Sequence, residues 1–317
     1  LERLRDEGNT VIVVEHDQET MEAADFLVDF GPGAGAEGGE IVATGSVEEI
    51  EAEPRSVTGA YLAGRRTIEV PDERREGDGE AFRVRGARAN NLKGIDVDFP
   101  TGKFICVTGV SGAGKSSLVN ETLYPAVARH VYYKHRSVGR HDELEGLELF
   151  DKVIEIDQSP IGRTPRSTAA TYTKVFDHIR DLFANLPTSQ IYGFDKGRFS
   201  FNTEEGRCPE CGGQGVQKIE MNFLADVYVT CETCLGRRYD ETTLRVAYRG
   251  HTISDVLEMT VAEAREVFGE HPKIRRILDT LLDVGLDYVT LGQPSNTLSG
   301  GEAQRVKLSR ELAKVAT

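Results

Sequence analysis

The sequence has no apolar run that approaches the roughly 18 residues of a membrane-spanning helix. Its N-terminus also lacks the basic stretch and short apolar core of a secretion signal. These absences exclude a membrane span and favour a cytoplasmic protein. With 317 residues, the chain is long enough for two domains, or for one large α/β domain with an insertion.

Lysine is scarce: it supplies 11 of the 38 basic residues, whereas Asp and Glu together number 52. The net charge of −14 opposes non-specific attraction to nucleic acids and other polyanions. Two interpretations fit this balance, an ordinary acidic protein or a surface adapted to high intracellular salt. Because high salt screens charges within a few ångströms, the acidic balance is still compatible with a DNA partner.

Cysteine is also sparse, and five residues are too few for a disulfide scaffold in a chain of this size. Four of them form two CxxC pairs, Cys208 with Cys211 and Cys231 with Cys234, separated by nineteen residues. A tight CxxC turn directs both thiolates at one metal, so the two pairs predict a tetrahedral zinc site. Two disulfides or four free thiols are the alternatives. Cys106 lies in an apolar strand pattern and is expected to pack in a core.

The chain alternates strand and helix patterns, which is typical of an α/β fold. The β-branched run at 9–15 predicts a buried strand, and 82–100 predicts a hairpin. Apolar runs at 103–110 and 152–157 predict two more buried strands, with a helix at 115–134 between them. Further helical patterns lie on both sides of the cysteine pairs.

The segment GVSGAGKS begins at the end of the expected strand 103–110 and matches the phosphate-binding loop G-x-x-x-x-G-K-[ST]. Its glycines allow backbone N–H groups to turn toward phosphates at a helix N-terminus, whose dipole favours anions. Lys115 would bridge the β- and γ-phosphates of ATP, and Ser116 would bind Mg²⁺. A chance match is the alternative, which the strand and helix on its two sides disfavour. The expected nucleotide contacts are Gly109, Gly112, Gly114, Lys115, Ser116 and Ser117.

The segment LSGGEAQR near the C-terminus resembles the signature of ABC-type ATPases. That family uses a serine and a glycine pair at a helix N-terminus to hold the γ-phosphate of a nucleotide on the opposite unit. Ser299, Gly300 and Gly301 match them. The resemblance also implies a Q-loop glutamine at Gln158 and a switch histidine at His16. An ordinary loop glutamine and a surface histidine are the alternatives.

The order of the motifs is unusual, because His16 precedes the phosphate loop, whereas an ABC unit carries its switch histidine last. We therefore expect a junction between two tandem ATP-binding units. The chain begins with Leu1 rather than Met and shows no helix-capping signal at its C-terminal end, so we expect a fragment. The expected parts are the tail of the first unit at 1–64, a linker at 65–81, the P-loop core of the second unit at 82–160, an inserted signature and zinc DNA-binding domain at 161–290, and a truncated signature helix at 291–317.

A four-cysteine module between Q-loop and signature is similar to that of the UvrA family, the damage-sensing ATPases of nucleotide excision repair. Blocks along nearly the whole chain carry the resemblance, among them GNTVIVVEHD, TGVSGAGKS, IDQSPIGRTPRS and LGQPSNTLSGGEAQRVKL. It implies an α/β P-loop ABC-type ATPase core with an inserted helical signature domain that carries the four-cysteine zinc module. Ala225 departs from the family, which usually has proline there, and we expect its effect to stay within the hairpin between the cysteine pairs.

The resemblance implies an ATP-driven search for DNA damage by the recognition subunit of the UvrABC excinuclease. This subunit is a homodimer that binds double-stranded DNA without sequence preference and loads UvrB. Basic residues near the metal module are the expected DNA-facing side chains, although each could instead be a solvated or ion-paired surface charge. They are Lys152, Arg163, Arg166, Lys196, Arg198 and Arg207.

Other ATPase classes fit less well. A transporter ATPase has no use for the zinc insertion, and a zinc-hook ATPase needs long heptads around a single CxxC. The remaining alternative is functional: a zinc-dependent module that binds DNA and nucleotide without turnover. We expect the chain alone to bind ATP without hydrolysing it. Lys115 and Gln158 would belong to one composite site and His16 to the other, and neither would have its Walker B carboxylates within the chain.

Overall fold

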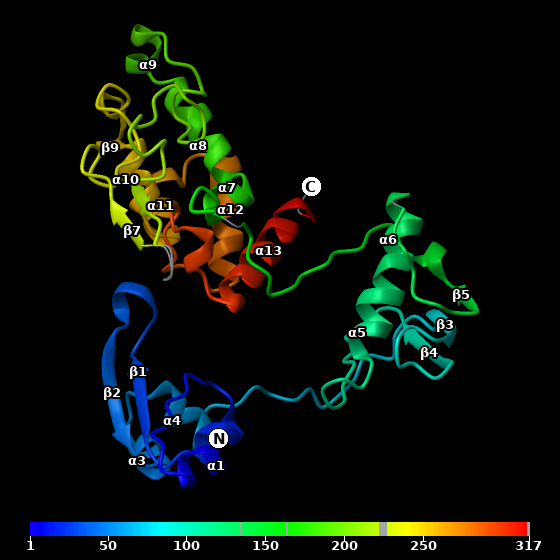
Figure 1. Ribbon diagram of the computed structural model, residues 1–317. Coiled ribbons are helices and arrows are strands. Elements are labelled where there is room, and N and C mark those ends of the chain that lie inside the picture. The colour runs from blue at the N-terminus through cyan, green and yellow to red at the C-terminus, as the bar shows by residue number, and fades with distance from the viewer. Residues whose placement is uncertain (134, 163, 222–226, 316–317) are drawn as a thin grey trace. The chain divides into compact units, whose positions relative to one another are not determined.

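The computed structural model describes four stretches of the chain (Figure 1): 1–133, 135–162, 164–221 and 227–315. These residues divide into two units, one made of Leu1–Ile68 with Gln158–Thr317 and the other of Glu69–Asp157. Arg163 and Ala225, which the sequence analysis singled out, lie outside the described residues.

The N-terminal segment contains a two-stranded hairpin followed by two short helices. β1 (Leu27–Gly31) pairs antiparallel with β2 (Glu40–Gly45). The next helix begins after Ser46, whose Oγ accepts from the backbone N–H of Glu49, while the Glu49 carboxylate accepts from the N–H of Ser46. This capping box fixes the helix start. The helices here are α1 (Glu2–Asp6), α2 (Gln18–Glu22), α3 (Val47–Ala52) and α4 (Val57–Leu62).

The unit Glu69–Asp157 is built on a three-stranded antiparallel sheet with the order β4-β3-β5. Its elements are β3 (Ala81–Ala87), β4 (Ile95–Pro100), α5 (Lys115–Leu118), a π-helical turn (Val119–Leu123), α6 (Tyr124–Tyr132) and β5 (Glu143–Glu145). Phe82, Val84 and Phe99 of the sheet pack with Leu118 and Val127 of the helices, because alternate strand residues face the helical layer. The expected hairpin and the expected helix are thereby confirmed.

The stretch Gln158–Thr317 is mainly helical. Its elements are α7 (Ala169–Thr173), α8 (Val175–Ala184), α9 (Pro187–Tyr192), β6 (Val216–Ile219), β7 (Val227–Thr230), β8 (Ala247–Tyr248), β9 (His251–Thr252), α10 (Ile253–Glu258), α11 (Val261–Phe268), α12 (Pro272–Asp283) and α13 (Gly300–Val315). Helix α12 is amphipathic: Ile274, Ile277, Leu278 and Leu281 recur at helical spacing and are buried. They join the largest hydrophobic core of the molecule.

Three strand predictions are wrong. Residues 9–15, 103–110 and 152–157 form no strand; Val14 is 99% exposed and Phe104 95%. Cys106 is exposed as well, so its expected place in a core is also wrong. An apolar run becomes a buried strand only where neighbouring strands hydrogen-bond to it, and the sheets of the described residues contain none that pairs with these runs.

No helix in the described part of the chain is long and apolar enough to span a bilayer.

Candidate functional site

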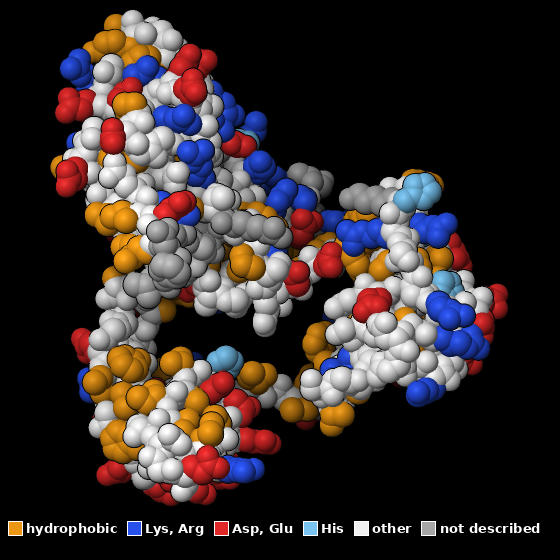
Figure 2. Space-filling view, viewed as in Figure 1, with side chains coloured by type: hydrophobic (Ala, Val, Ile, Leu, Met, Phe, Trp, Pro, Cys, Tyr) orange, Lys and Arg blue, Asp and Glu red, His pale blue; other side chains and the backbone are white. Residues whose placement is uncertain are grey.

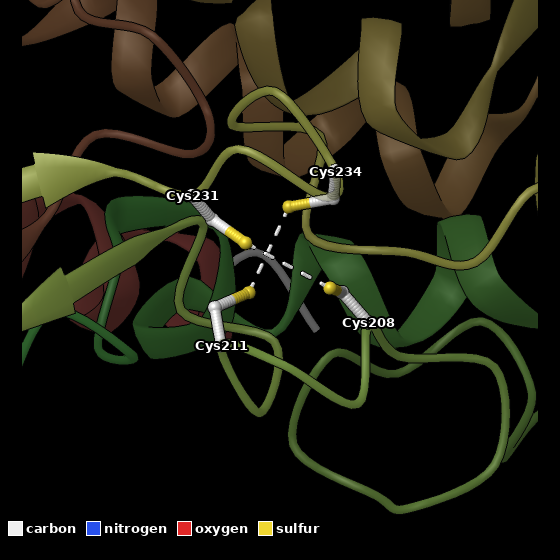
Figure 3. Close-up of side chains that lie close together, drawn as sticks. All are labelled: Cys208, Cys211, Cys231 and Cys234. Atoms are coloured by element: carbon white, nitrogen blue, oxygen red, sulfur yellow. Dashed lines mark hydrogen bonds between the residues drawn. The ribbon is translucent and has the colours of Figure 1, made fainter.

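The four paired cysteines form one buried cluster (Figure 3). The Sγ atoms of Cys208 and Cys231 are 4.0 Å apart, those of Cys211 and Cys234 are 3.7 Å apart, and all four lie within 4.8 Å of one another. These separations are far longer than a disulfide bond of about 2 Å. Four sulfurs at the zinc–sulfur distance of about 2.3 Å in a tetrahedron would be about 3.8 Å apart. The cluster therefore fits one zinc ion.

The surroundings of the cluster shift the pKa values of its thiols in opposite directions. The backbone N–H of Gly215 donates to Cys211 Sγ over 3.2 Å. Burial raises the pKa of the Cys234 thiol to about 12. Burial also acts on Cys231, but hydrogen bonds from the N–H groups of Cys234 and Thr233 and from neighbouring thiols outweigh it and lower its pKa to about 7. A bound cation would stabilise all four thiolates together.

The P-loop adopts a backbone that requires glycine. Gly114 has a φ of +104°, and a Cβ there would lie 2.9 Å from Leu92 Cδ2. The next residue, Lys115, begins α5. The first backbone N–H groups of this helix have no partner within the helix and are available to a ligand. Lys115 Nζ donates to the carbonyl oxygens of Gly109 (2.7 Å) and Val110 (2.8 Å). The ammonium thus lies over the loop, where a phosphate would meet it.

Two asparagines hold the P-loop, and the sequence analysis did not identify them. Asn91 Nδ2 donates to the carbonyl oxygen of Gly112 over 2.8 Å, and Asn90 Nδ2 donates to Ser117 Oγ over 2.9 Å. The hydroxyl of Ser117 is therefore buried and engaged, whereas Ser116 is exposed. The amide-rich NNL motif was the only signal in the sequence that could have identified them.

The Q-loop candidate lies beside the signature. A Cβ placed on Gly300 would be 3.6 Å from the Cβ of Gln158. Lys307 lies about two helical turns further along α13, and its Nζ donates to the carbonyl oxygen of Ser159 over 2.6 Å. The structure thus places the Q-loop position beside the signature position, although the two were expected to serve different composite sites. His16 is exposed, in a stretch without regular secondary structure.

Ser299 caps α13. Its Oγ accepts from the N–H of Glu302 over 3.2 Å, and its own N–H donates to the Glu302 carboxylate over 2.8 Å. Tyr288 donates its hydroxyl to the other Glu302 oxygen over 2.7 Å. The Ser299 hydroxyl uses a lone pair for the cap, so its proton stays available to a phosphate.

Among the described residues, the basic side chains expected to contact DNA differ in their ion pairs and hydrogen bonds within the protein. Lys196 forms an ion pair with Asp181 at 2.8 Å on the surface. Arg198 is more constrained, because it pairs with Asp240 at 2.8 Å and lies over the ring of Phe194. The remaining three are Lys152, which is exposed, Arg207, which lies 4.0 Å from Glu204, and Arg166, which donates to the carbonyl oxygen of Gly212.

A comparison with models of protein families found no match. Among curated proteins, the chain is 60% identical over all of its 317 residues to UvrABC system protein A of Methanothermobacter thermautotrophicus. The corresponding proteins of Aquifex aeolicus and Bacillus subtilis are 58% and 56% identical over the same length. The chain spans 33 to 34% of these relatives.

Among solved structures, UvrA2 from Deinococcus radiodurans matches 99% of this chain with a TM-score of 0.91 and 47% identity, over 38% of its own length. This likeness confirms the expected fold class, an α/β ABC-type ATPase core with an inserted helical domain that carries the four-cysteine cluster. Identities of 56 to 60% along the full 317 residues show that the chain belongs to the UvrA family, as a segment about a third as long as its curated relatives.

Proposed function

We propose that the chain supplies ATP-binding and DNA-binding parts of the damage-recognition subunit of nucleotide excision repair. One observation carries the proposal: a buried four-cysteine cluster lies in the sequence between Gln158 and Ser299, the Q-loop and signature positions of an ABC-type ATPase. The relatives are named for the UvrABC system. The whole protein would be a cytoplasmic homodimer that hydrolyses ATP and loads UvrB onto damaged double-stranded DNA.

The nucleotide would bind to the P-loop with Mg²⁺. Lys115 would leave the loop carbonyls for the β- and γ-phosphates, the Ser116 hydroxyl would bind Mg²⁺, and Gln158 would approach the γ-phosphate. His16 would contact the γ-phosphate in the other composite site, which Ser299 would face. Zinc would hold together two cysteine knuckles, the first formed around Cys208 and Cys211 and the second around Cys231 and Cys234. This role is structural, because four thiolates leave no open coordination position.

DNA would bind through its phosphates. Figure 2 shows Lys and Arg side chains gathered beside α7 and α8, in the same part of the chain as the cysteine cluster, although the chain as a whole is acidic. Contacts to phosphate position a protein without reading bases, which suits a sensor that inspects any sequence. As an isolated segment, the chain would be a module that binds DNA and nucleotide without turnover.

Charge reversal tests the DNA-binding role. Lys196→Glu with Arg207→Glu should weaken binding of unrelated undamaged duplexes equally, and lower the slope of log K against log salt by about 0.9 for each lost phosphate contact. Arg3→Glu is the matched control, since this side chain is 92% exposed on α1. Fluorescence anisotropy over a salt series measures both quantities. A changed preference between two undamaged sequences would contradict a backbone-reading role.

A further inference from the structure

Arg238 connects the second cysteine knuckle to the segment that leads into the signature. Its backbone carbonyl accepts from the N–H of Cys208 over 2.9 Å, so the residue is part of the knuckle fold. Its guanidinium lies over the ring of Phe201, 5.0 Å from the centroid, and Nη2 donates to the carbonyl oxygen of Gly292 over 3.1 Å. Gly292 stands seven residues before Ser299.

Arg166 makes the corresponding connection from the other side. It follows Gln158 by eight residues, and its Nη2 donates to the carbonyl oxygen of Gly212 over 3.1 Å. Gly212 directly follows Cys211 and has a φ of +57°; a Cβ there would lie 3.2 Å from Arg166 Nη2. The loop after the Q-loop position is therefore attached to the first knuckle.

The two loops are also bonded to each other. The N–H of Ser295 donates to the carbonyl oxygen of Ser167 over 2.8 Å, and Thr168 forms a β-bridge with Pro294. A ring of contacts results, which runs from the first knuckle through Arg166 to Ser167, across to the loop at 292–295, and back through Arg238 to the second knuckle. The N–H of Cys208, bonded to the carbonyl oxygen of Arg238, already joins the two knuckles, and a zinc ion bound by both would join them a second time.

We propose that Arg166 and Arg238 are positioning residues that couple the zinc module to the loops carrying Gln158 and Ser299. The proposal rests on the proposed function for the zinc ion and the signature role of Ser299. Arginine suits the task because its planar guanidinium can stack on Phe201 while an N–H reaches a carbonyl. Zinc with four thiolates would carry a net charge of −2, and the guanidinium of the partly buried Arg238 would offset part of it. Loosening either knuckle should therefore loosen the signature segment.

Amide hydrogen exchange of the zinc-loaded 317-residue chain tests the coupling. In Arg238→Met, peptides covering 290–298 should exchange about tenfold faster, the change expected when a charge-assisted hydrogen bond is lost. Arg276→Met is the matched control, because Arg276 is exposed on α12 and lies outside both knuckles. Zinc content is measured in every sample. Wild-type exchange at 290–298 in an Arg238→Met protein that keeps its zinc would overturn the proposal.

If Arg238→Met loses zinc or fails to fold, Arg166→Met provides the second test, since it leaves the second knuckle intact. It should speed exchange at 292–298, because within the described residues Arg166 reaches this segment through Ser167 and not by a bond of its own. Unchanged exchange there would refute the coupling. Removal of zinc from the wild-type chain with a chelator should have the same effect. A wild-type chain that binds no zinc would refute the proposed metal site alone, because the Arg166→Met comparison can be made in metal-free protein.

Discussion

The ammonium of Lys115 lies 2.7 Å from the carbonyl oxygen of Gly109, so the P-loop lysine rests on the loop that would hold a nucleotide. When ATP binds, a charged phosphate would replace these neutral carbonyl oxygens as the hydrogen-bond acceptor of the Lys115 ammonium. Charge-assisted hydrogen bonds contribute roughly 1.5–3 kcal/mol. Lys115→Ala should therefore raise the Kd for ATP by about tenfold to a hundredfold, as measured by titration with a fluorescent ATP analogue.

Lys103→Ala is the control for this substitution, because Lys103 is an exposed lysine of the same unit that stands outside the P-loop motif. It should leave the Kd unchanged. Equal affinities of the wild-type and Lys115→Ala chains for ATP would show that the loop does not bind the nucleotide in the expected way.

Alanine substitutions at two glycines of the P-loop can distinguish the cost of backbone strain from the cost of steric crowding. Gly112 and Gly114 both have positive φ, +79° and +104°, but only a Cβ on Gly114 meets neighbours, at 2.9 Å from Leu92 and 3.0 Å from Asn91. Alanine in the left-handed region costs about 1–2 kcal/mol, so Gly112→Ala should lower the unfolding free energy by about 1 kcal/mol. Gly114→Ala should cost at least about 1 kcal/mol more and weaken ATP binding. Equal denaturation midpoints for the two variants would argue against the observed packing.

Loss of one cysteine should release the metal. Cys231 is fully buried among the other three sulfurs, and its replacement by alanine removes a ligand and leaves three thiols without their cation. Metal binding in such sites contributes on the order of 10 kcal/mol to local folding. Cys231→Ala should lose zinc and exchange amides freely over 208–234, while unit Glu69–Asp157 keeps its protection. Cys106→Ala, at an exposed cysteine outside the cluster, should retain one zinc per chain.

The chain should bind ATP without releasing phosphate steadily. Hydrolysis by an ABC-type ATPase requires the attacking water, the metal and the γ-phosphate to be positioned together. The expected site residues of this chain include a P-loop, a Q-loop glutamine and a signature, and no Walker B carboxylate is among them. A coupled phosphate assay should give the same background for wild-type and Lys115→Ala chains. Turnover that disappears in Lys115→Ala would show that the missing groups had been misassigned.

Motifs whose chemistry depends on local spacing could be predicted from the sequence. Cys208 and Cys211 lie in one tight turn, and the P-loop is fixed by its glycines and the helix that follows, so the cluster and the helix start appeared where expected. The absence of a strand at 103–110 could not be predicted, because an apolar pattern is typical of a buried strand but does not show whether neighbouring strands are present to pair with it.

Contacts between distant residues were also beyond the sequence analysis. Arg238 and Gly292 are 54 positions apart and meet only because the core around α10 to α13 brings their segments together. Arg166 was predicted to face DNA on the basis of its charge and its place beside the metal module. In the structure, the Arg166 side chain donates to the carbonyl oxygen of Gly212. A charge pattern in the sequence cannot reveal this bond between distant residues.

The most direct test of the central claim, that zinc organises a DNA-binding module in this chain, is the duplex affinity measured before zinc removal, after it, and after zinc is restored. Anisotropy with a labelled undamaged duplex gives the Kd at each step, and amide exchange of unit Glu69–Asp157 shows whether the P-loop unit stays folded. Affinity that falls by at least about tenfold without zinc and returns with it is the predicted result. An affinity that does not depend on zinc, or no duplex binding in any of the three states, would contradict the account.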